Sequence, residues 1–117
     1  MTFIKFKGFY ITLLLALLIL FFSIQSPGEV VDTKFLVSDK LLHLFAYCLM
    51  VIPVSLERII PHFSVFLFSL AYGGFIELIQ PLAGREADIM DFFANAAGII
   101  LGILVARCLT LIFKVQL

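Results

Sequence analysis

The chain has 117 residues, of which 63% are hydrophobic and 14% charged, and its formal net charge is zero. Soluble domains carry about 45–50% apolar and about 25% charged residues, and a soluble chain of this length cannot bury so much apolar surface. The composition therefore excludes a soluble domain and predicts one small membrane domain over residues 1–117. The zero net charge gives no indication of a nucleic-acid partner.

Four apolar runs follow one another along the chain, and a bilayer core needs about 20 apolar residues per helix. A basic segment precedes the first run, but the length of the run and the lack of a small-residue cleavage site favour a retained span over a signal peptide. The second run reaches spanning length only if its helix begins near Ser38, and Pro53 is expected to kink or fray its far end. The expected spans cover about residues 8–25, 38–57, 62–80 and 88–113.

The distribution of basic residues predicts the orientation of these spans. Four spans place both termini on one side, and Lys and Arg residues concentrate on the cytoplasmic side of membrane proteins. Five lie on the side of the termini and three on the other, namely Lys5, Lys7, Arg58, Arg107 and Lys114 against Lys34, Lys40 and Arg85. The expected fold class is thus an all-α, four-helix transmembrane bundle with cytoplasmic N and C termini.

Polar residues gather at the start of the second span. Asp39, His43 and Tyr47 are spaced by four, so they share one helix face, and Lys40 borders it. A carboxylate that orients an imidazole suits acid–base chemistry, which makes Asp39 and His43 candidate catalytic residues. The alternative is structural, because an acid complements a helix N-terminus and a Lys side chain can extend to the interface.

The end of the third span carries a second polar group. Glu77 and Gln80 lie three residues apart, and Arg85 follows in the short loop. A charge within a span is costly and usually functional, so Glu77 needs a partner, and Arg85 or His43 are the candidates. A guanidinium also suits phosphate or carboxylate binding. A purely structural ion pair is the alternative.

The fourth span begins with a regular stripe. Asp88, Asp91, Asn95, Gly98 and Gly102 follow spacings of three and four. Gly98 and Gly102 form a small-residue packing seam. Asp88 and Asp91 have a structural interpretation as a helix cap and its N3 acid, whereas Asn95 lies too deep for a cap. We expect Asn95 to form a hydrogen bond across helices or to contact a ligand.

The sequence favours no cofactor. Cys48 and Cys108 stand far apart without a CxxC or Cys/His zinc spacing, and both are expected to be small buried residues. Carboxylates and His43 together form the alternative of a divalent-metal site, although no H-E-x-x-H spacing supports it.

The polar residues also carry a family resemblance, which extends over about residues 35–107. Their order is Ser38-Asp39-Lys40-x-x-His43-x-x-x-Tyr47, Glu77-x-x-Gln80, Arg85, Asp88, Asp91, Asn95, Gly98 and Gly102. This pattern resembles the VanZ-like membrane proteins. The resemblance implies a small multi-pass protein of the bacterial cytoplasmic membrane, in a family whose founding member is associated with resistance to the lipoglycopeptide teicoplanin. It implies no defined molecular activity.

We therefore predict a site, open to the outer leaflet, for a lipid-linked or cell-envelope molecule with a phosphate or sugar head group. Lys40 and Arg85 are expected to hold the anion, while His43, oriented by Asp39, and Glu77 exchange protons. The remaining expected ligand-binding residues are Tyr47, Gln80, Asp88, Asp91 and Asn95.

Three classes of function stay open at this point: a hydrolase or transferase, a non-enzymatic binder of a lipid or lipoglycopeptide, and a structural or assembly partner in a membrane complex. In the third class, the polar residues hold the helices together through hydrogen bonds and ion pairs between helices. A transporter is disfavoured because the chain has no internal repeat, although a homo-oligomer would reopen that alternative.

Overall fold

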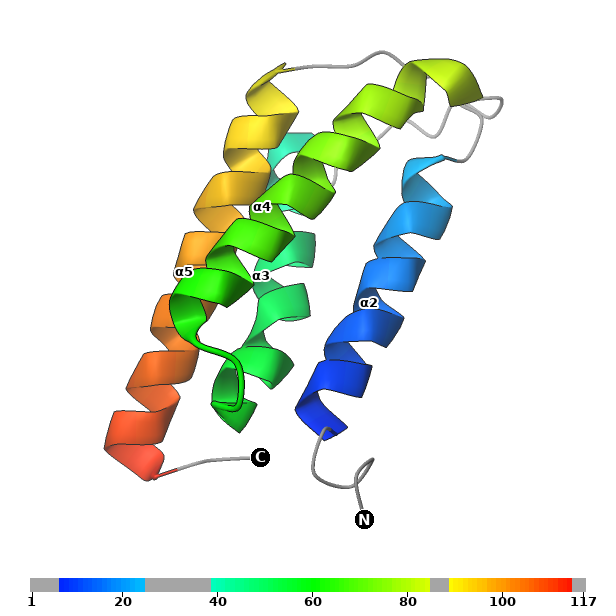
Figure 1. Cartoon of the computed structure of the whole chain (residues 1–117). Helices are drawn as coiled ribbons and strands as arrows, with labels where there is room; N and C mark the ends of the chain where they lie inside the picture. Colours follow the sequence, from blue (N-terminus) through cyan, green and yellow to red (C-terminus); the bar gives the residue numbers. More distant parts are fainter. Residues whose placement is uncertain (1–6, 25–38, 85–88, 115–117) are drawn as a thin grey trace.

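The structure is a computed structural model that describes residues 7–24, 39–84 and 89–114. These residues form α-helices and one short 3-10 helix, with the bounds α2 Lys7–Ser23, α3 Asp39–Glu57, α4 His62–Ile79, η2 Gln80–Ala83 and α5 Ile89–Phe113. Each α-helix begins and ends within two residues of an expected span, so the all-helical prediction is confirmed. Figure 1 shows the helices running up and down, with the start of α2 and the end of α5 at the same, lower end of the bundle.

Three of these helices are long and apolar enough to cross a bilayer: Lys40–Glu57, His62–Leu82 and Ile89–Phe113, with 18, 21 and 25 residues. α2 is equally apolar but has 17 residues, which corresponds to about 26 Å against a bilayer core of about 30 Å. Within the described residues, the structure thus supports three spans directly. That α2 is a fourth span stays a prediction.

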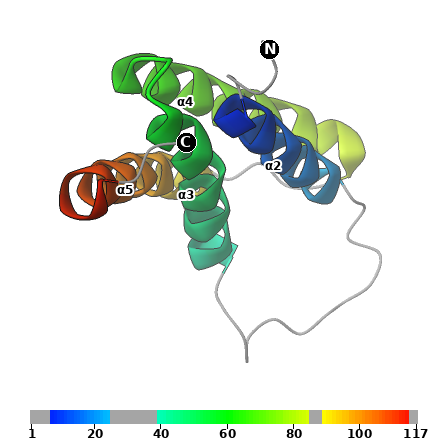
Figure 2. The same cartoon turned by 90° about the horizontal axis from the view of Figure 1, so that it is seen from below.

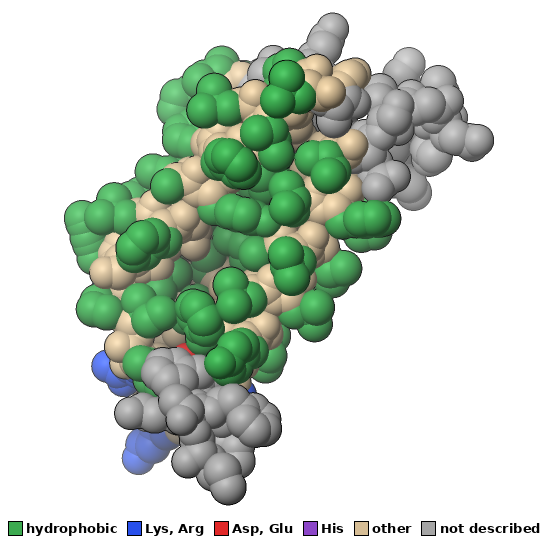
Figure 3. Space-filling view, turned by 45° about the vertical axis from the view of Figure 1, so that its right-hand side comes forward, with side chains coloured by type: hydrophobic (Ala, Val, Ile, Leu, Met, Phe, Trp, Pro, Cys, Tyr) green, Lys and Arg blue, Asp and Glu red, His purple; other side chains and the backbone are tan. Residues whose placement is uncertain are grey.

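The outer surface of the bundle is apolar. Large hydrophobic side chains are exposed on all four helices, among them Phe22, Leu49, Phe68, Leu78 and Leu111. Figure 3 shows hydrophobic side chains along the length of one face and Lys and Arg side chains near its lower end. A surface of this kind is stable when lipid chains rather than water surround it.

Helix α3 occupies the central position, between α5 and α2 (Figure 2). Its closest partner is α5, and two glycines permit this contact. A Cβ atom on Gly98 would lie 2.2 Å from the Leu44 carbonyl oxygen, and one on Gly102 would lie 2.4 Å from Val51 Cγ2. Small residues allow helix backbones to approach closely in membranes. The predicted seam therefore lies at the contact between α5 and α3, beside a core made of Tyr47, Met50, Val51, Val54, Val65, Ile99 and Ile103.

Helix α2 packs on α3 at Pro53. Proline disturbs the helical hydrogen bonds around it, and the N–H group of Val54 donates to Thr12 Oγ1 at 3.1 Å. The same hydroxyl donates to the Met50 carbonyl at 2.7 Å. Thr12 thus bridges the disturbed turn, and α3 continues to Glu57 without the expected fraying.

Glu57 holds the first turn of α2. Its carboxylate accepts hydrogen bonds from the N–H groups of Gly8, at 2.8 Å, and Phe9, at 3.3 Å. The first N–H groups of a helix have no partner within the helix, and a negative charge near them is favourable. Glu57 is only 1% exposed, so the last residue of α3 is a buried cap for the first turn of α2.

The two cysteines differ in their surroundings. Cys48 is buried, as expected, but Cys108 is exposed. The expectation for Cys108 was wrong because the residue lies off the buried face of α5, which includes Asp91, Asn95, Gly98, Gly102 and Ala106. An apolar run shows that a helix is in lipid or in a core, and it does not show which of its residues turn inward.

Candidate functional site

The functional candidates meet near the upper end of the bundle, where α3 and α5 begin and α4 ends. Asp91, in the first turn of α5, is 7% exposed. Lys40 Nζ from α3 lies 2.8 Å from Asp91 Oδ1, and His43 Nε2 lies 3.9 Å from Asp91 Oδ2. The two oxygens of one buried carboxylate therefore face two different basic side chains of a neighbouring helix.

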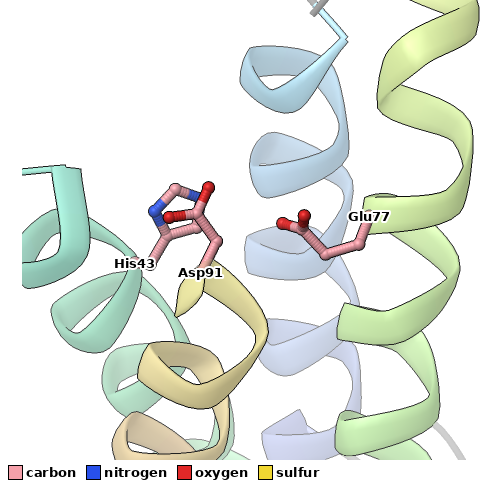
Figure 4. Close-up of side chains that lie close together, drawn as sticks. All are labelled: His43, Glu77 and Asp91. Atoms are coloured by element: carbon pink, nitrogen blue, oxygen red, sulfur yellow. The ribbon is translucent and has the colours of Figure 1, made fainter. Parts of the chain in front are cut away.

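Glu77 adds a second carboxylate from α4. It is 8% exposed, and one ligand-type atom from each of His43, Glu77 and Asp91 lies within 4.8 Å of the other two. Figure 4 shows the Glu77 side chain extending from α4 toward the other two side chains. Three helices thus bring an imidazole and two carboxylates together, and we call these three residues the upper triad.

A second polar layer lies one helical turn deeper than the upper triad. Tyr47, Gly73 and Asn95 each follow or precede a triad residue by four positions, and Tyr47 and Asn95 are each 1% exposed. A Cβ on Gly73 would lie 3.2 Å from Asn95 Nδ2 and 3.4 Å from Tyr47 Cε2, so the glycine makes room for both side chains.

The side-chain polar atoms of Tyr47 and Asn95 have no hydrogen-bond partner among residues 7–24, 39–84 and 89–114. Buried polar groups in proteins are usually satisfied by the protein, by water or by a ligand.

Gln80 faces the same region from the end of α4. Its Nε2 donates to the Ser23 carbonyl of α2 at 3.4 Å, and within the described parts of the chain its Oε1 has no hydrogen-bond partner. Gln80, His43 and Tyr47 line a cavity of about 320 Å³ between α2 and α3. The other walls of this cavity are mainly apolar and include Leu15, Leu18, Ile19, Phe22, Leu42, Ala46 and Leu49.

An apolar groove lies on the opposite side of the upper triad, between α4 and α5. It has a volume of about 820 Å³, and Glu77 is the only charged residue that lines it in the described structure. Its other lining residues include Leu67, Leu70, Phe75, Leu78, Ile89 and Phe92. The upper triad and the polar layer below it, which we together call the polar cluster, therefore separate the cavity from the groove, and the walls of both are largely apolar.

The structure thus gathers most of the residues singled out in the sequence. His43, Tyr47, Lys40, Glu77, Gln80, Asp91 and Asn95 all lie in this region. Arg85 and Asp88 lie outside the described residues, as does the side chain of Asp39. That Asp39 orients His43 therefore stays a prediction. The Asp91 carboxylate of α5 lies beside His43, in a contact across helices that spacing along one helix does not reveal.

The lower end of the bundle holds a separate polar contact that the sequence analysis missed. Arg107 Nε of α5 donates to His62 Nδ1 at 2.9 Å, and His62 Nε2 lies 3.0 Å from the Ser55 carbonyl of α3. The two histidines therefore have different environments, because His62 joins three helices while His43 faces carboxylates. The sequence offered one indication of this contact, which is that His62 directly follows Pro61 at the start of a helix.

Comparison with known proteins identifies the family of the chain. A protein-family model described as VanZ/LLP1 matches residues 7–113, which include all four α-helices. Searches of curated proteins and of solved structures found no match. The family match and the three long apolar helices together indicate a membrane protein. The chain belongs to the VanZ/LLP1 family.

Proposed function

We propose that the chain binds a membrane amphiphile whose anionic or hydroxyl-bearing head group enters the polar cluster at the upper end. One observation carries this proposal: a single cavity has His43, Tyr47 and Gln80 in its wall while the rest of its lining is mainly apolar. An amphiphile has the same division of chemistry. Ligand sites are typically apolar hollows with a few polar groups that orient the ligand.

The size and the apolar lining of the cavity fit one part of a lipid. The cavity of about 320 Å³ is at the lower limit of ligand pockets, which measure about 300–1,000 Å³. It accommodates a head group or one end of a chain. The remaining hydrocarbon of the ligand then lies along the apolar outer surface of the helices, where lipid is the natural neighbour.

Each polar side chain has a role in this proposal. Lys40, whose side chain is 44% exposed, attracts the anionic group at the opening. The Tyr47 hydroxyl and the Asn95 amide group donate hydrogen bonds to head-group oxygens, and Gln80 Oε1 accepts one from a head-group hydroxyl; these side-chain atoms have no protein partner in the described residues. Arg85 and Asp88 would act from the adjoining loop, and His43 and Glu77 would exchange protons if the ligand is also a substrate.

We further propose that both termini are cytoplasmic, that α2 completes a four-span bundle in the bacterial cytoplasmic membrane, and that the cluster faces the outer leaflet. The count of basic residues supports this orientation. A site on that side would meet lipid-linked precursors of the envelope or the acyl chain of a lipoglycopeptide. Such an encounter is the proposed route to altered teicoplanin sensitivity.

The proposal is tested by native mass spectrometry of the protein in mild detergent, with a polyprenyl phosphate and phosphatidylglycerol as separate probes. The wild type should retain the polyprenyl phosphate, and His43→Ala and Gln80→Leu should release it. His62→Ala is the matched control because it removes the other histidine of the chain, at the lower end. Equal retention by all variants would contradict the proposal, and retention of both probes would widen the ligand class to anionic lipids.

A structural role is the second candidate, and the Lys40–Asp91 ion pair favours it. Polar contacts between helices stabilise membrane bundles by about 0.6–2 kcal/mol each. If this is the whole function, Lys40→Ala and Asp91→Ala should weaken folding or partner association without changing the binding of any lipid. An enzyme would instead lose turnover in Glu77→Gln while it keeps the bound substrate.

A further inference from the structure

We infer that the upper triad is a binding site for a divalent metal ion of the zinc class. His43, Glu77 and Asp91 come from three different helices, and one donor atom of each lies within 4.8 Å of the others. Imidazole nitrogen and carboxylate oxygen are both zinc ligands in proteins. Zinc sites with three protein ligands keep a fourth position open for water or substrate.

The distances are close to those of an occupied site. Zinc bonds to nitrogen and oxygen measure about 2.0–2.2 Å, so the ligands of a tetrahedral site lie about 3.4 Å apart. His43 Nε2 and Asp91 Oδ2 are 3.9 Å apart, and a ligand atom of Glu77 lies within 4.8 Å of one from each of these two residues. Two of the three ligands lie on the closely packed α3–α5 pair, and the third comes from α4.

The arrangement of charges also suits a cation. Asp91 directs Oδ1 to Lys40 and Oδ2 toward His43, so a metal ion can bind Oδ2 without displacing the lysine. Among the described side chains of the site, two ionised carboxylates and one ammonium carry one formal negative charge. A divalent ion reverses that sign, and the site then attracts an anion at the open position.

A second observation points to a ligand at the same place. Gln80 Oε1 and Tyr47 Oη have no hydrogen-bond partner in the described structure, and their residues are 2% and 1% exposed. Both residues line the cavity that His43 also lines. Gln80 Oε1 is therefore placed to accept a hydrogen bond from a water on the metal. The Tyr47 hydroxyl is placed to donate one to a water or an anion there, as groups around metal sites generally do.

This inference uses residues of the proposed amphiphile site but does not depend on that ligand, so the two ideas fail separately. The test is a titration of the purified, chelator-treated full chain in detergent with Zn²⁺ and, in parallel, Co²⁺, without added lipid. Cys108→Ser serves as the background because Cys108 is an exposed thiol. We expect one ion per chain and the visible absorbance that tetrahedral Co²⁺ produces.

Loss of one ligand in His43→Ala, Glu77→Gln or Asp91→Asn should weaken binding by more than the roughly 10–100-fold that loss of an outer-sphere partner costs, whereas His62→Ala should bind like the background protein. His43→Cys keeps a zinc ligand and should add a thiolate-to-cobalt band in the near ultraviolet, which a merely structural role cannot produce. Absence of stoichiometric binding, or equal binding by His43→Ala and the background protein, would overturn the inference.

Discussion

The Gly98→Ala substitution tests whether close approach of α3 and α5 holds the bundle and its polar cluster together. A Cβ atom at this position would lie 2.2 Å from the Leu44 carbonyl oxygen and 2.9 Å from the carbonyl carbon. These are backbone atoms, which cannot rotate away as a side chain can. A carbon–oxygen contact of about 3.3 Å is restored only if the two helices separate by about 1 Å.

The expected cost follows from two opposing terms. Overpacking a well-packed contact costs about 3 kcal/mol at the upper end of the usual range, while alanine in a helix interior is favoured over glycine by about 1 kcal/mol. The net loss is therefore about 2 kcal/mol, which is nearly a 30-fold change in the folding equilibrium. The separation of the two helices should also displace Asp91, seven residues earlier on α5, and weaken the binding of any ligand at the upper triad.

Gly74→Ala is the matched control. Its Cβ would meet Phe92 Cε1 at 3.4 Å, an ordinary contact, so the variant should be neutral or stabilised by up to about 1 kcal/mol. Unfolding is followed in mixed micelles of rising sodium dodecyl sulfate content by resistance to a short protease pulse. A Gly98→Ala protein within about 0.5 kcal/mol of Gly74→Ala, the spread of ordinary surface changes, would refute the reasoning.

Three further predictions use the same unfolding assay. Thr12→Val removes the hydroxyl that bridges α3 at Pro53 and should lower the free energy of unfolding by about 1–3 kcal/mol. Thr110→Val is the control, because the Thr110 hydroxyl donates to the Ala106 carbonyl of its own helix, and its loss of stability should be clearly smaller. Equal losses of stability in the two variants would count against the bridge. Glu57→Gln removes the charge beside the first turn of α2 and should cost about 1 kcal/mol and speed amide hydrogen exchange in that turn; unchanged exchange would contradict it. Asn95→Leu removes a buried amide without a partner in the described residues. It should change the free energy of unfolding by less than about 1 kcal/mol and abolish binding of the polyprenyl phosphate. The opposite result, a destabilised protein that still binds the polyprenyl phosphate, would favour the structural role.

The helices themselves follow from the sequence because their cause is local. Apolar runs of spanning length, ended by Pro61, Pro81 or polar residues, determine where each helix begins and ends, and the structure agrees within two residues. Spacings of three and four likewise place Asp91, Asn95 and Gly98 on one face. Even the closeness of a helix contact at Gly98 and Gly102 is readable, since only small residues permit it.

Only the tertiary structure decides which residues meet across helices. Periodicity along one helix does not reveal that the Asp91 carboxylate of α5 lies beside His43 of α3. The predicted pairing of Asp39 with His43 involves a side chain outside the described residues and stays a prediction. Glu57 shows the same limit, because its partners are N–H groups of α2, 48 and 49 residues away. The physical reason is that every outer helix face is apolar alike, so composition does not select a partner. Close backbone contacts and a few polar bonds select it, and these exist only once the helices have packed.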